Sequence, residues 1–267
     1  MGASGRDNVS NSVAYERCGA GEVLLLIHAI GMSRNAWRPV LPMLQAQRDV
    51  IAVDLPGHGG SAPIASHLAP APAGFARVLA ALLDELGVDA VHAAGNSVGG
   101  WTALELAKLG RARSVCALGP AGLWNRGPIR PMIALALPYL AARQWPTVAS
   151  RAMRAGPTRS LLLHHAFGHP ERIPVPDAER IVTELAAARG FLPTLVAAHT
   201  ARFIRGGGLD VPVTIVFGQR DHVVPKDARS GEELPEHTRW LHPPELGHVP
   251  MWDDPAAVAD AILTASS

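Results

Sequence analysis

The sequence predicts an α/β fold built on a mostly parallel, doubly wound sheet that carries an inserted helical cap. Short apolar segments alternate with longer segments of helical periodicity, as in sheets covered by helices on both faces. This alternation stops after Leu118 and resumes at Val211. The chain has 267 residues, of which 48% are hydrophobic, so it is long enough to bury a globular core around such a sheet.

Five apolar segments are predicted to be the strands of this sheet. They are short and rich in Val, Ile, Leu and Ala, and they cover residues 24–29, 50–55, 90–95, 114–118 and 211–218. Residues 74–86 and 97–109 have apolar positions at helical spacing, and each segment is followed by a glycine, Gly87 or Gly110. We expect these two segments to be crossover helices, and residues 256–264 to form the last helix.

The stretch between the fourth and fifth predicted strands is helical in pattern but is broken repeatedly by proline. Its apolar parts predict short helices over residues 132–143, 160–167 and 178–188. We therefore divide the chain into a core, residues 1–121 and 206–267, and a helical cap, residues 122–205. The alternative is a second helical layer with no role at the active site.

Composition excludes several classes of partner. The net charge is +1 and the arginines are scattered, so no basic stripe predicts a nucleic-acid partner, and a small-molecule partner is expected. The polar N-terminus predicts no signal peptide, and no apolar run is long enough to span a bilayer, so we expect a cytoplasmic protein without a membrane partner. Cys18 and Cys116 are expected to be reduced thiols.

The strongest local signal is the sequence Gly-Asn-Ser-Val-Gly-Gly from Gly95 to Gly100, between a predicted strand and a predicted helix. In a G-x-S-x-G elbow the chain turns so sharply that glycines are needed beside the serine. Such a turn exposes the Ser97 hydroxyl as a nucleophile. It also leaves the N–H of Val98 free at a helix N-terminus, where it can donate to an oxyanion. The alternative is a glycine-rich turn whose serine only caps the helix.

A serine nucleophile needs a base and an acid, which follow it in the order acid, histidine. Asp221 comes directly after the last predicted strand, which places its carboxylate at the edge of the sheet where catalytic groups of parallel sheets gather. His248 follows in the sequence Gly-His-Val-Pro, before the last helix. We therefore predict Ser97, Asp221 and His248 as the catalytic residues.

The rival acids and histidines are expected to lie outside the triad. Asp227 lies at the start of a further helix, and Asp253 and Asp254 are predicted as a helix N-cap pair. His222 and His242 lie beside the motifs rather than in them. His164 and His165 are adjacent in a helical segment, where their side chains point in different directions, so they are expected to be structural rather than metal ligands. No metal site and no cofactor is predicted.

Two loops that follow predicted strands complete the predicted site. The sequence His-Ala-Ile-Gly from His28 ends the first strand, and the N–H of Ile30 is expected to be the second oxyanion donor. His28 itself is expected to brace this loop by hydrogen bonds. The loop Asp-Leu-Pro-Gly-His-Gly that begins at Asp54 is expected to shape the floor of the pocket by turn formation rather than to bind a metal.

Taken together, these motifs resemble those of the α/β-hydrolase superfamily, in the capped branch that includes esterases, lactonases, C–C bond hydrolases, epoxide hydrolases and haloalkane dehalogenases. The resemblance extends from Leu24 to the last helix and rests on HAIG, DLPGHG, GNSVGG, GQRDHVVP and GHVPMWDDP in this order. It implies an α/β-hydrolase fold, with Ser97, Asp221 and His248 as the triad and Ile30 and Val98 as the oxyanion donors. Because dehalogenases and epoxide hydrolases have an aspartate where this chain has Ser97, those two activities are disfavoured.

We therefore expect a serine hydrolase that cleaves an ester or lactone of a small, mainly apolar substrate through an acyl-enzyme. C–C bond hydrolysis is the alternative, although the Ser-Gly-Pro-Gly oxyanion loop of such enzymes is absent. An acyltransferase and a non-catalytic ligand-binding receptor on the same fold also stay open. Six arginines of the cap are expected at its surface rather than against a substrate carboxylate: Arg126, Arg130, Arg143, Arg151, Arg154 and Arg159.

Overall fold

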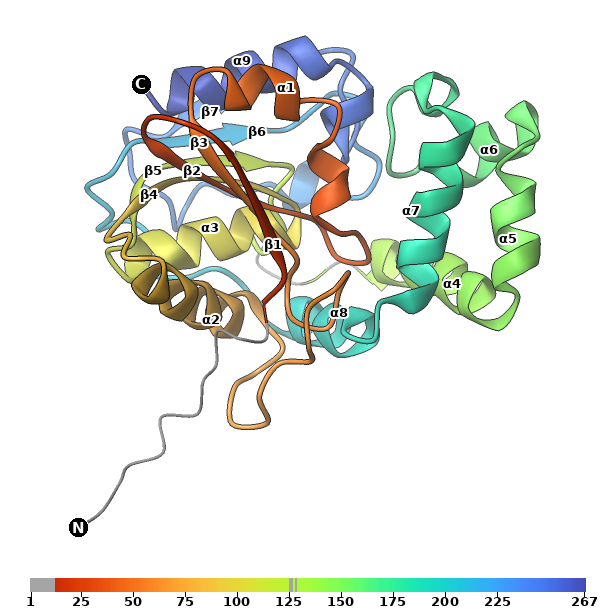
Figure 1. Cartoon of the computed structure of the whole chain (residues 1–267), viewed down its shortest axis with the longest axis horizontal. Helices are drawn as coiled ribbons and strands as arrows, with labels where there is room; N and C mark the ends of the chain where they lie inside the picture. Colours follow the sequence, from red (N-terminus) through yellow and green to blue (C-terminus); the bar gives the residue numbers. More distant parts are fainter. Residues whose placement is uncertain (1–12, 125–126, 128) are drawn as a thin grey trace.

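A seven-stranded sheet forms the centre of the computed structural model, which describes residues 13–124, 127 and 129–267 (Figure 1). The strand order is β1-β3-β2-β4-β5-β6-β7, and every neighbouring pair is parallel except β1 and β3. The predicted, mostly parallel sheet is therefore confirmed. Its strands are β1 (Tyr15–Gly19), β2 (Val23–Ile27), β3 (Asp49–Val53), β4 (Val91–Asn96), β5 (Ala112–Leu118), β6 (Val213–Val216) and β7 (Arg239–Leu241).

The five predicted strands correspond to β2 to β6, with ends shifted by one to two residues in most cases. The two edge strands were not predicted. β1 has an exposed or half-buried side chain at every position, so it lacks the apolar run that marks a buried strand, and its backbone pairing with β3 holds it in place. β7 has only three residues, fewer than periodicity can identify.

Helices cover both faces of the sheet (Figure 1). α2 (Pro72–Glu85) and α3 (Val98–Lys108) pack on one face, and α1 (Leu41–Gln45) and α9 (Pro255–Ala265) on the other. Each face has its own apolar core, with Phe75 and Phe217 in one and Trp37 in the other. The predicted doubly wound arrangement, including both crossover helices and the final helix, is confirmed.

In the described part of the chain between β5 and β6, five α-helices form what we call the helical insertion, on one side of the sheet (Figure 1). They are α4 (Ile129–Gln144), α5 (Pro146–Ala152), α6 (Gly156–Leu163), α7 (Val175–Ala187) and α8 (Phe191–Thr200). The predictions for residues 132–143 and 178–188 correspond to α4 and α7. The prediction for 160–167 was wrong by four residues, because α6 begins at Gly156 with Pro157 in its first turn.

The sequence did not predict α5 and α8. α5 has no buried residue in its seven positions, so it has no apolar face from which to predict it. α8 contains Pro193, which we interpreted as a break, but this proline lies in the first turn of the helix, where its missing N–H costs no hydrogen bond. The division of the chain into a core and a separate cap domain stays a prediction.

Both cysteines are free thiols, as predicted. Cys18 lies on the edge strand β1, and Cys116 is buried on β5, where burial raises the pKa of its thiol to about 12. Neither thiol is therefore activated as a nucleophile.

Among the described residues, no single helix has both the length and the apolar composition needed to cross a membrane. α7 and α8 meet that length and composition only as a pair, and they are bent by 79° relative to each other.

Candidate active site

Ser97 lies at the sharp turn between β4 and α3, where the sequence predicted the elbow. Its backbone is in a strained conformation, with φ 56° and ψ −118°. A Cβ atom on Gly95 would overlap the carbonyl oxygen of Gly99, and one on Gly99 would overlap that of Ile27. The two glycines are therefore required by the close approach of the backbones on either side of the serine.

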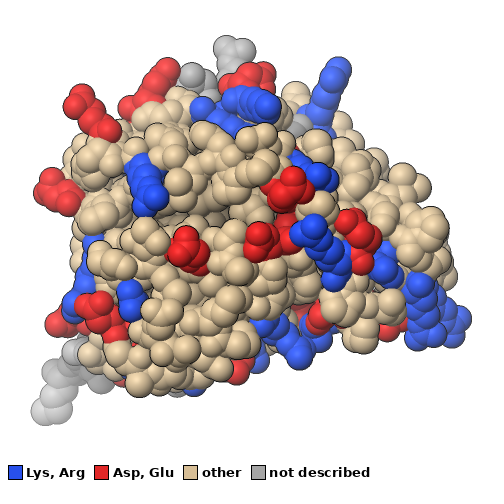
Figure 2. Space-filling view, turned by 90° about the horizontal axis from the view of Figure 1, so that it is seen from above, with Lys and Arg blue, Asp and Glu red and all other residues tan. Residues whose placement is uncertain are grey.

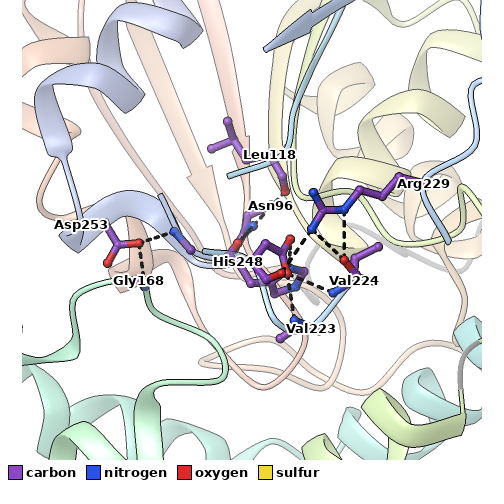
Figure 3. A network of polar contacts seen from close by, with 10 residues as sticks. Asn96, Leu118, Gly168, Val223, Val224, Arg229, His248 and Asp253 are labelled. Carbon is purple, nitrogen blue, oxygen red and sulfur yellow. Dashed lines mark hydrogen bonds and ion pairs between the residues drawn. The ribbon is translucent and has the colours of Figure 1, made fainter. Parts of the chain in front are cut away.

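The structure brings Asp221 and His248 together at the same edge of the sheet, and both side chains are buried. His248 Nδ1 lies 3.0 Å from Asp221 Oδ2. The other carboxylate oxygen, Oδ1, accepts hydrogen bonds from the N–H groups of Val223, at 2.9 Å, and Val224, at 3.0 Å (Figure 3). Asp221 can therefore orient the imidazole while its own position is held by the backbone.

These contacts decide the ionisation of Asp221. Burial by itself would raise the pKa of the carboxyl group. The charge and the hydrogen bond of His248, with the N–H groups of Val224 and Val223, outweigh burial, so the pKa of Asp221 lies below its ordinary value. The group is therefore a carboxylate at neutral pH and accepts the Nδ1 proton of His248, which leaves Nε2 as the proton acceptor.

Asn96 fixes the loop that carries His248. Its Nδ2 group donates to the backbone carbonyl of His248, at 2.7 Å, and to that of Leu118, at 2.9 Å (Figure 3). Asn96 is fully buried and directly precedes Ser97. One residue therefore links the end of β4 to the histidine loop, a role that sequence reasoning missed because Asn96 occupies the variable position of the G-x-S-x-G pattern.

Ser97 lines two cavities. The smaller has a volume of about 50 Å³, and the larger, of about 120 Å³, is also lined by His248. Ile30, Ser97 and Leu135 line both. The walls are mostly apolar, with Trp124, Met132, Leu195 and Val224 in the smaller cavity and Leu162, Phe167, Ile181 and Phe191 in the larger. Ser97 thus borders two apolar compartments, and helices of the insertion form part of the wall of each.

This arrangement can be compared with known proteins. The model of the alpha/beta hydrolase family matches residues 24–261, almost the whole of the described chain. The chain belongs to the α/β hydrolase family. The fold and the family resemblance predicted from the motifs are therefore confirmed.

Relatives of this α/β hydrolase cleave different bonds. The epoxide hydrolase EphH of Mycobacterium tuberculosis is 32% identical over 200 residues, which cover 68% of this chain and 88% of EphH. The pimeloyl-[acyl-carrier protein] methyl ester esterase of Aeromonas hydrophila is 28% identical over 233 residues, 80% of this chain and 83% of the esterase. The structure of a thermophilic esterase from Thermogutta terrifontis has a TM-score of 0.73 at 21% identity and covers 94% of this chain and 92% of that one. The relatives therefore support a hydrolase but do not determine which kind of bond it cleaves.

The predicted oxyanion donors of this α/β hydrolase both lie beside Ser97. Val98 is the first residue of α3, where a backbone N–H has no partner within the helix. The Ile30 N–H makes no hydrogen bond to any other residue that the structure describes. Because Ile30 and Val98 line the same cavity as the serine, both groups are available to an oxygen atom bound there. Their catalytic role stays a prediction.

His28 braces its loop, as expected. The N–H of Leu55 donates to its Nε2, at 2.8 Å, so Nδ1 carries the proton and donates to the Ala29 carbonyl, at 2.7 Å. Burial lowers the pKa of His28 and keeps the ring neutral. The neighbouring Asp54 accepts from the N–H groups of Arg34 and Gly60 and pairs with the Arg34 guanidinium. Within the described ranges, no group of three His, Cys, Asp or Glu residues is arranged to hold a metal ion.

The prediction of Asp253 as half of an N-cap pair was wrong. Asp254 is the N-cap of α9 and accepts from the N–H of Ala257. The buried Asp253 carboxylate instead accepts from three backbone N–H groups, those of His169 at 2.8 Å, Gly247 at 2.7 Å and Gly168 at 3.0 Å. Figure 3 shows the contact with Gly168. Asp253 therefore connects Gly168 and His169, in the segment between α6 and α7, to Gly247, the residue before His248.

His165 was expected to be structural, but the structure places it in the wall of the larger cavity. α6 ends at Leu163, so His164 and His165 follow the helix rather than lie within it. Burial, together with the charges of His164 and His222, lowers the pKa of His165. A neutral imidazole is therefore one of the few polar groups that a substrate in this cavity meets, and nothing in its sequence spacing indicates this.

The cap arginines do not contribute to either cavity among the described residues. Arg126 lies outside the described residues. Arg154 pairs with Glu179, at 2.6 Å, and Arg143 donates to the Tyr139 hydroxyl, at 3.3 Å. The expectation that these arginines do not face a substrate carboxylate agrees with the composition of the two cavities.

Proposed function

We propose that this α/β hydrolase cleaves an ester or lactone of a small, mainly apolar substrate through an acyl-enzyme on Ser97. One observation carries the proposal: a serine at a strained elbow shares a cavity with a histidine whose Nδ1 is held by a buried carboxylate. Acyl transfer requires a hydroxyl group beside an imidazole base that a carboxylate holds in the correct orientation.

In the proposed reaction, Ser97 Oγ attacks the substrate carbonyl carbon and His248 Nε2 takes the hydroxyl proton. The N–H groups of Ile30 and Val98 stabilise the oxyanion of the tetrahedral intermediate. The intermediate collapses, the bond to the alcohol oxygen breaks, and His248 returns its proton to that oxygen. Water, deprotonated by His248, then attacks the acyl-enzyme and releases the acid and the free serine.

The two cavities support the proposed substrate class. The carbon atom that bonds to Ser97 Oγ carries the acyl chain and the alkoxy group of the ester, and the serine borders two apolar compartments, one for each. Volumes of about 50 Å³ and about 120 Å³ suit short chains. A substrate with a free carboxylate is disfavoured because neither wall contains Lys or Arg.

Epoxide opening is disfavoured on chemical grounds, although one relative is named for it. If a serine oxygen opened an epoxide, the product would be an ether with the enzyme. An ether has no carbonyl group at which water can attack with oxyanion stabilisation. The reaction would therefore stop after one turnover.

The test is hydrolysis of p-nitrophenyl esters of increasing acyl length by the wild type and by Ser97→Ala, with fluorophosphonate labelling located by mass spectrometry. Loss of the serine is expected to lower kcat on the order of 10⁴- to 10⁶-fold. Ser160→Ala, a serine of α6 away from both cavities, is the matched control.

Normal turnover by a folded Ser97→Ala protein would reject the nucleophile. Labelling at Ser97 without turnover of any ester or lactone would reject ester hydrolysis and favour C–C bond cleavage or a ligand-binding receptor. Appearance of a transfer product when an alcohol or amine acceptor is added, in preference to the free acid, would indicate an acyltransferase.

A further inference from the structure

The outward side of the helical insertion carries exposed apolar side chains that no described residue covers. Four of them are spaced four, four and three residues apart on α4, so they form one row along the helix. Trp145 and Val148 continue the exposed apolar residues onto α5. We call these six residues the insertion stripe: Ile129 (61% exposed), Ile133 (48%), Leu137 (62%), Leu140 (47%), Trp145 (60%) and Val148 (66%).

The opposite side of α4 is already accounted for. Met132 and Leu135 line the smaller cavity, and Leu135 and Pro138 line the larger one. α4 is therefore apolar on the side that faces the substrate and again on the side that faces solvent. Lining the cavities does not explain why the solvent-facing side of α4 is apolar. An exposed apolar patch of this kind marks an interaction surface.

The charges carried by α4, α5 and α6 themselves are of one sign. Residues 129–163 contain no Asp or Glu and five arginines, Arg130, Arg143, Arg151, Arg154 and Arg159. Of the ion pairs in the described part of the chain, only Arg154–Glu179 involves one of them. Figure 2 shows the molecule from above, with broad uncharged areas between scattered basic and acidic side chains.

The arginines of α4 flank its apolar row. At 100° per residue, Arg130 and Arg143 are displaced roughly 70° to either side of the row's centre. Arginines in this position can keep their alkyl chains along an apolar surface and extend their guanidinium groups to anions beside it. A row of apolar residues between two arginines is the pattern of a helix that lies in the plane of a membrane interface.

We propose that the insertion stripe and its arginines dock this protein on the surface of an anionic lipid bilayer. The apolar side chains enter the boundary between headgroups and acyl chains, and the arginines contact lipid phosphates. A second copy of the chain is disfavoured as the occupant, because a two-fold interface through the stripe would bring the same five arginines together, and of these only Arg154 has an acidic partner among the described ion pairs.

This proposal differs from our expectation of no membrane partner, which rested on the lack of a spanning segment. Docking on one face requires no such segment. It also does not depend on the proposed hydrolysis, since binding is measured without a substrate.

The experiment is sedimentation of the full chain with vesicles of phosphatidylcholine alone and of phosphatidylcholine and phosphatidylglycerol in equal parts. We expect at least tenfold stronger partitioning to the anionic vesicles at low ionic strength, and a decrease as salt is added. A blue shift of tryptophan emission that is reduced in Trp145→Phe would locate the contact.

Two pairs of substitutions separate the apolar contribution from the charged one. Leu137→Ser with Val148→Ser should abolish the bound fraction. Arg130→Gln with Arg151→Gln should weaken binding to anionic vesicles roughly 25-fold, about fivefold for each arginine. The matched control is Leu109→Ser with Arg113→Gln. Leu109 is an exposed leucine directly after α3, and Arg113 is an exposed arginine on β5, so this variant should bind as the wild type does.

Equal partitioning to both kinds of vesicle, no partitioning to either, or loss of binding in the control as large as in the stripe variants would overturn the proposal. A dimer that forms at micromolar concentration and is abolished by Leu137→Ser would also overturn it, because the stripe would then be an interface between copies.

Discussion

The sheet edge around Ser97 and the helical insertion above it are built in opposite ways. At the sheet edge, two buried polar side chains make several hydrogen bonds each: the Asp221 carboxylate has three partners, and Asn96 Nδ2 has two. In the insertion, α5 and α6 have no buried residue at all, and α4 has apolar side chains on two sides. The difference indicates that fixed geometry is concentrated in the part that we propose to be catalytic, and adaptable apolar surface in the part that we propose to select the substrate.

The largest effect that tests this contrast is expected from Asp221→Asn. The amide nitrogen would face His248 Nδ1 and hold the imidazole in the tautomer that cannot accept the serine proton. Ester turnover should decrease by about 10⁴-fold at neutral pH, with little change in the unfolding temperature. The exposed Asp227→Asn is the control, measured in the same assay. A decrease of less than tenfold in a folded Asp221→Asn protein would remove Asp221 from the mechanism.

The adjacent acids Asp253 and Asp254 provide a matched pair. Asp253→Ala leaves three buried N–H groups without their acceptor and should destabilise the protein by about 3 kcal/mol or more. Asp254→Ala removes only a helix cap, at a cost of about 1 kcal/mol. Urea unfolding measures both values.

Because one of the three N–H groups belongs to Gly247, Asp253→Ala should also lower kcat while Asp254→Ala does not. Equal effects of the two substitutions on stability and on kcat would mean that Asp253 does not position the His248 loop.

The free energy of unfolding at acidic pH tests the buried loop that begins at Asp54 and contains His58. Burial lowers the pKa of His58 to about 3. The neighbouring His28 also lowers it, and the hydrogen bond to the Pro56 carbonyl acts in the opposite direction. The unfolded chain binds a proton at His58 below pH ~6.5 that the folded protein does not bind, so stability should fall as pH decreases from there.

The expected slope is about 1.4 kcal/mol for each pH unit from this one group. His58→Gln should reduce that slope, whereas substitution of the exposed His67 by Gln should not. Chemical denaturation between pH 4 and pH 7 measures both. An unchanged slope in His58→Gln would show that the ring is not held neutral in the folded protein.

The smallest effects are expected in the apolar walls. Ala198→Leu narrows the smaller cavity, and Ala166→Leu narrows the larger one. Each should raise KM roughly tenfold for long chains on its own side of the ester, with methyl acetate analogues unaffected. Kinetics with esters that vary only in the acyl or only in the alcohol chain would assign the two compartments. If both substitutions affected the same series, the two cavities would be one binding site.

The parts that were predictable from the sequence are those with local causes. Gly95 is required by a backbone contact with Gly99, within a few residues of Ser97. The contact of Gly99 with Ile27 is distant in sequence, but both glycines lie in one short strand-turn-helix motif, so the elbow is visible as a pattern. The strands β2 to β6 are buried and therefore apolar. The contact between Asp221 and His248 was inferred from their order and from the edge of the sheet on which both lie.

The parts that were not predictable depend on distant partners. Asp253 meets Gly168 and His169 from far along the chain, and a short pattern cannot distinguish it from a capping residue. His165 lines the larger cavity because α6 ends two residues earlier, which follows from how the insertion packs. β1 is held by backbone pairing with β3 and by the Arg17–Asp49 ion pair, and neither contact gives its sequence the apolar run of a buried strand.

The contact of Asp253 with the insertion has a consequence for how such enzymes diversify. The Asp253 carboxylate accepts from backbone N–H groups of the insertion, and its carbonyl accepts from the Arg172 guanidinium. A Cβ on Gly168 would crowd the Glu245 carbonyl and the Gly247 N–H. The carboxylate contact therefore depends on the backbone of Gly168 and His169, and not on the side chains of the helices around them. Those helices can diverge in sequence, and so change the cavity walls, while this contact with the His248 loop is kept.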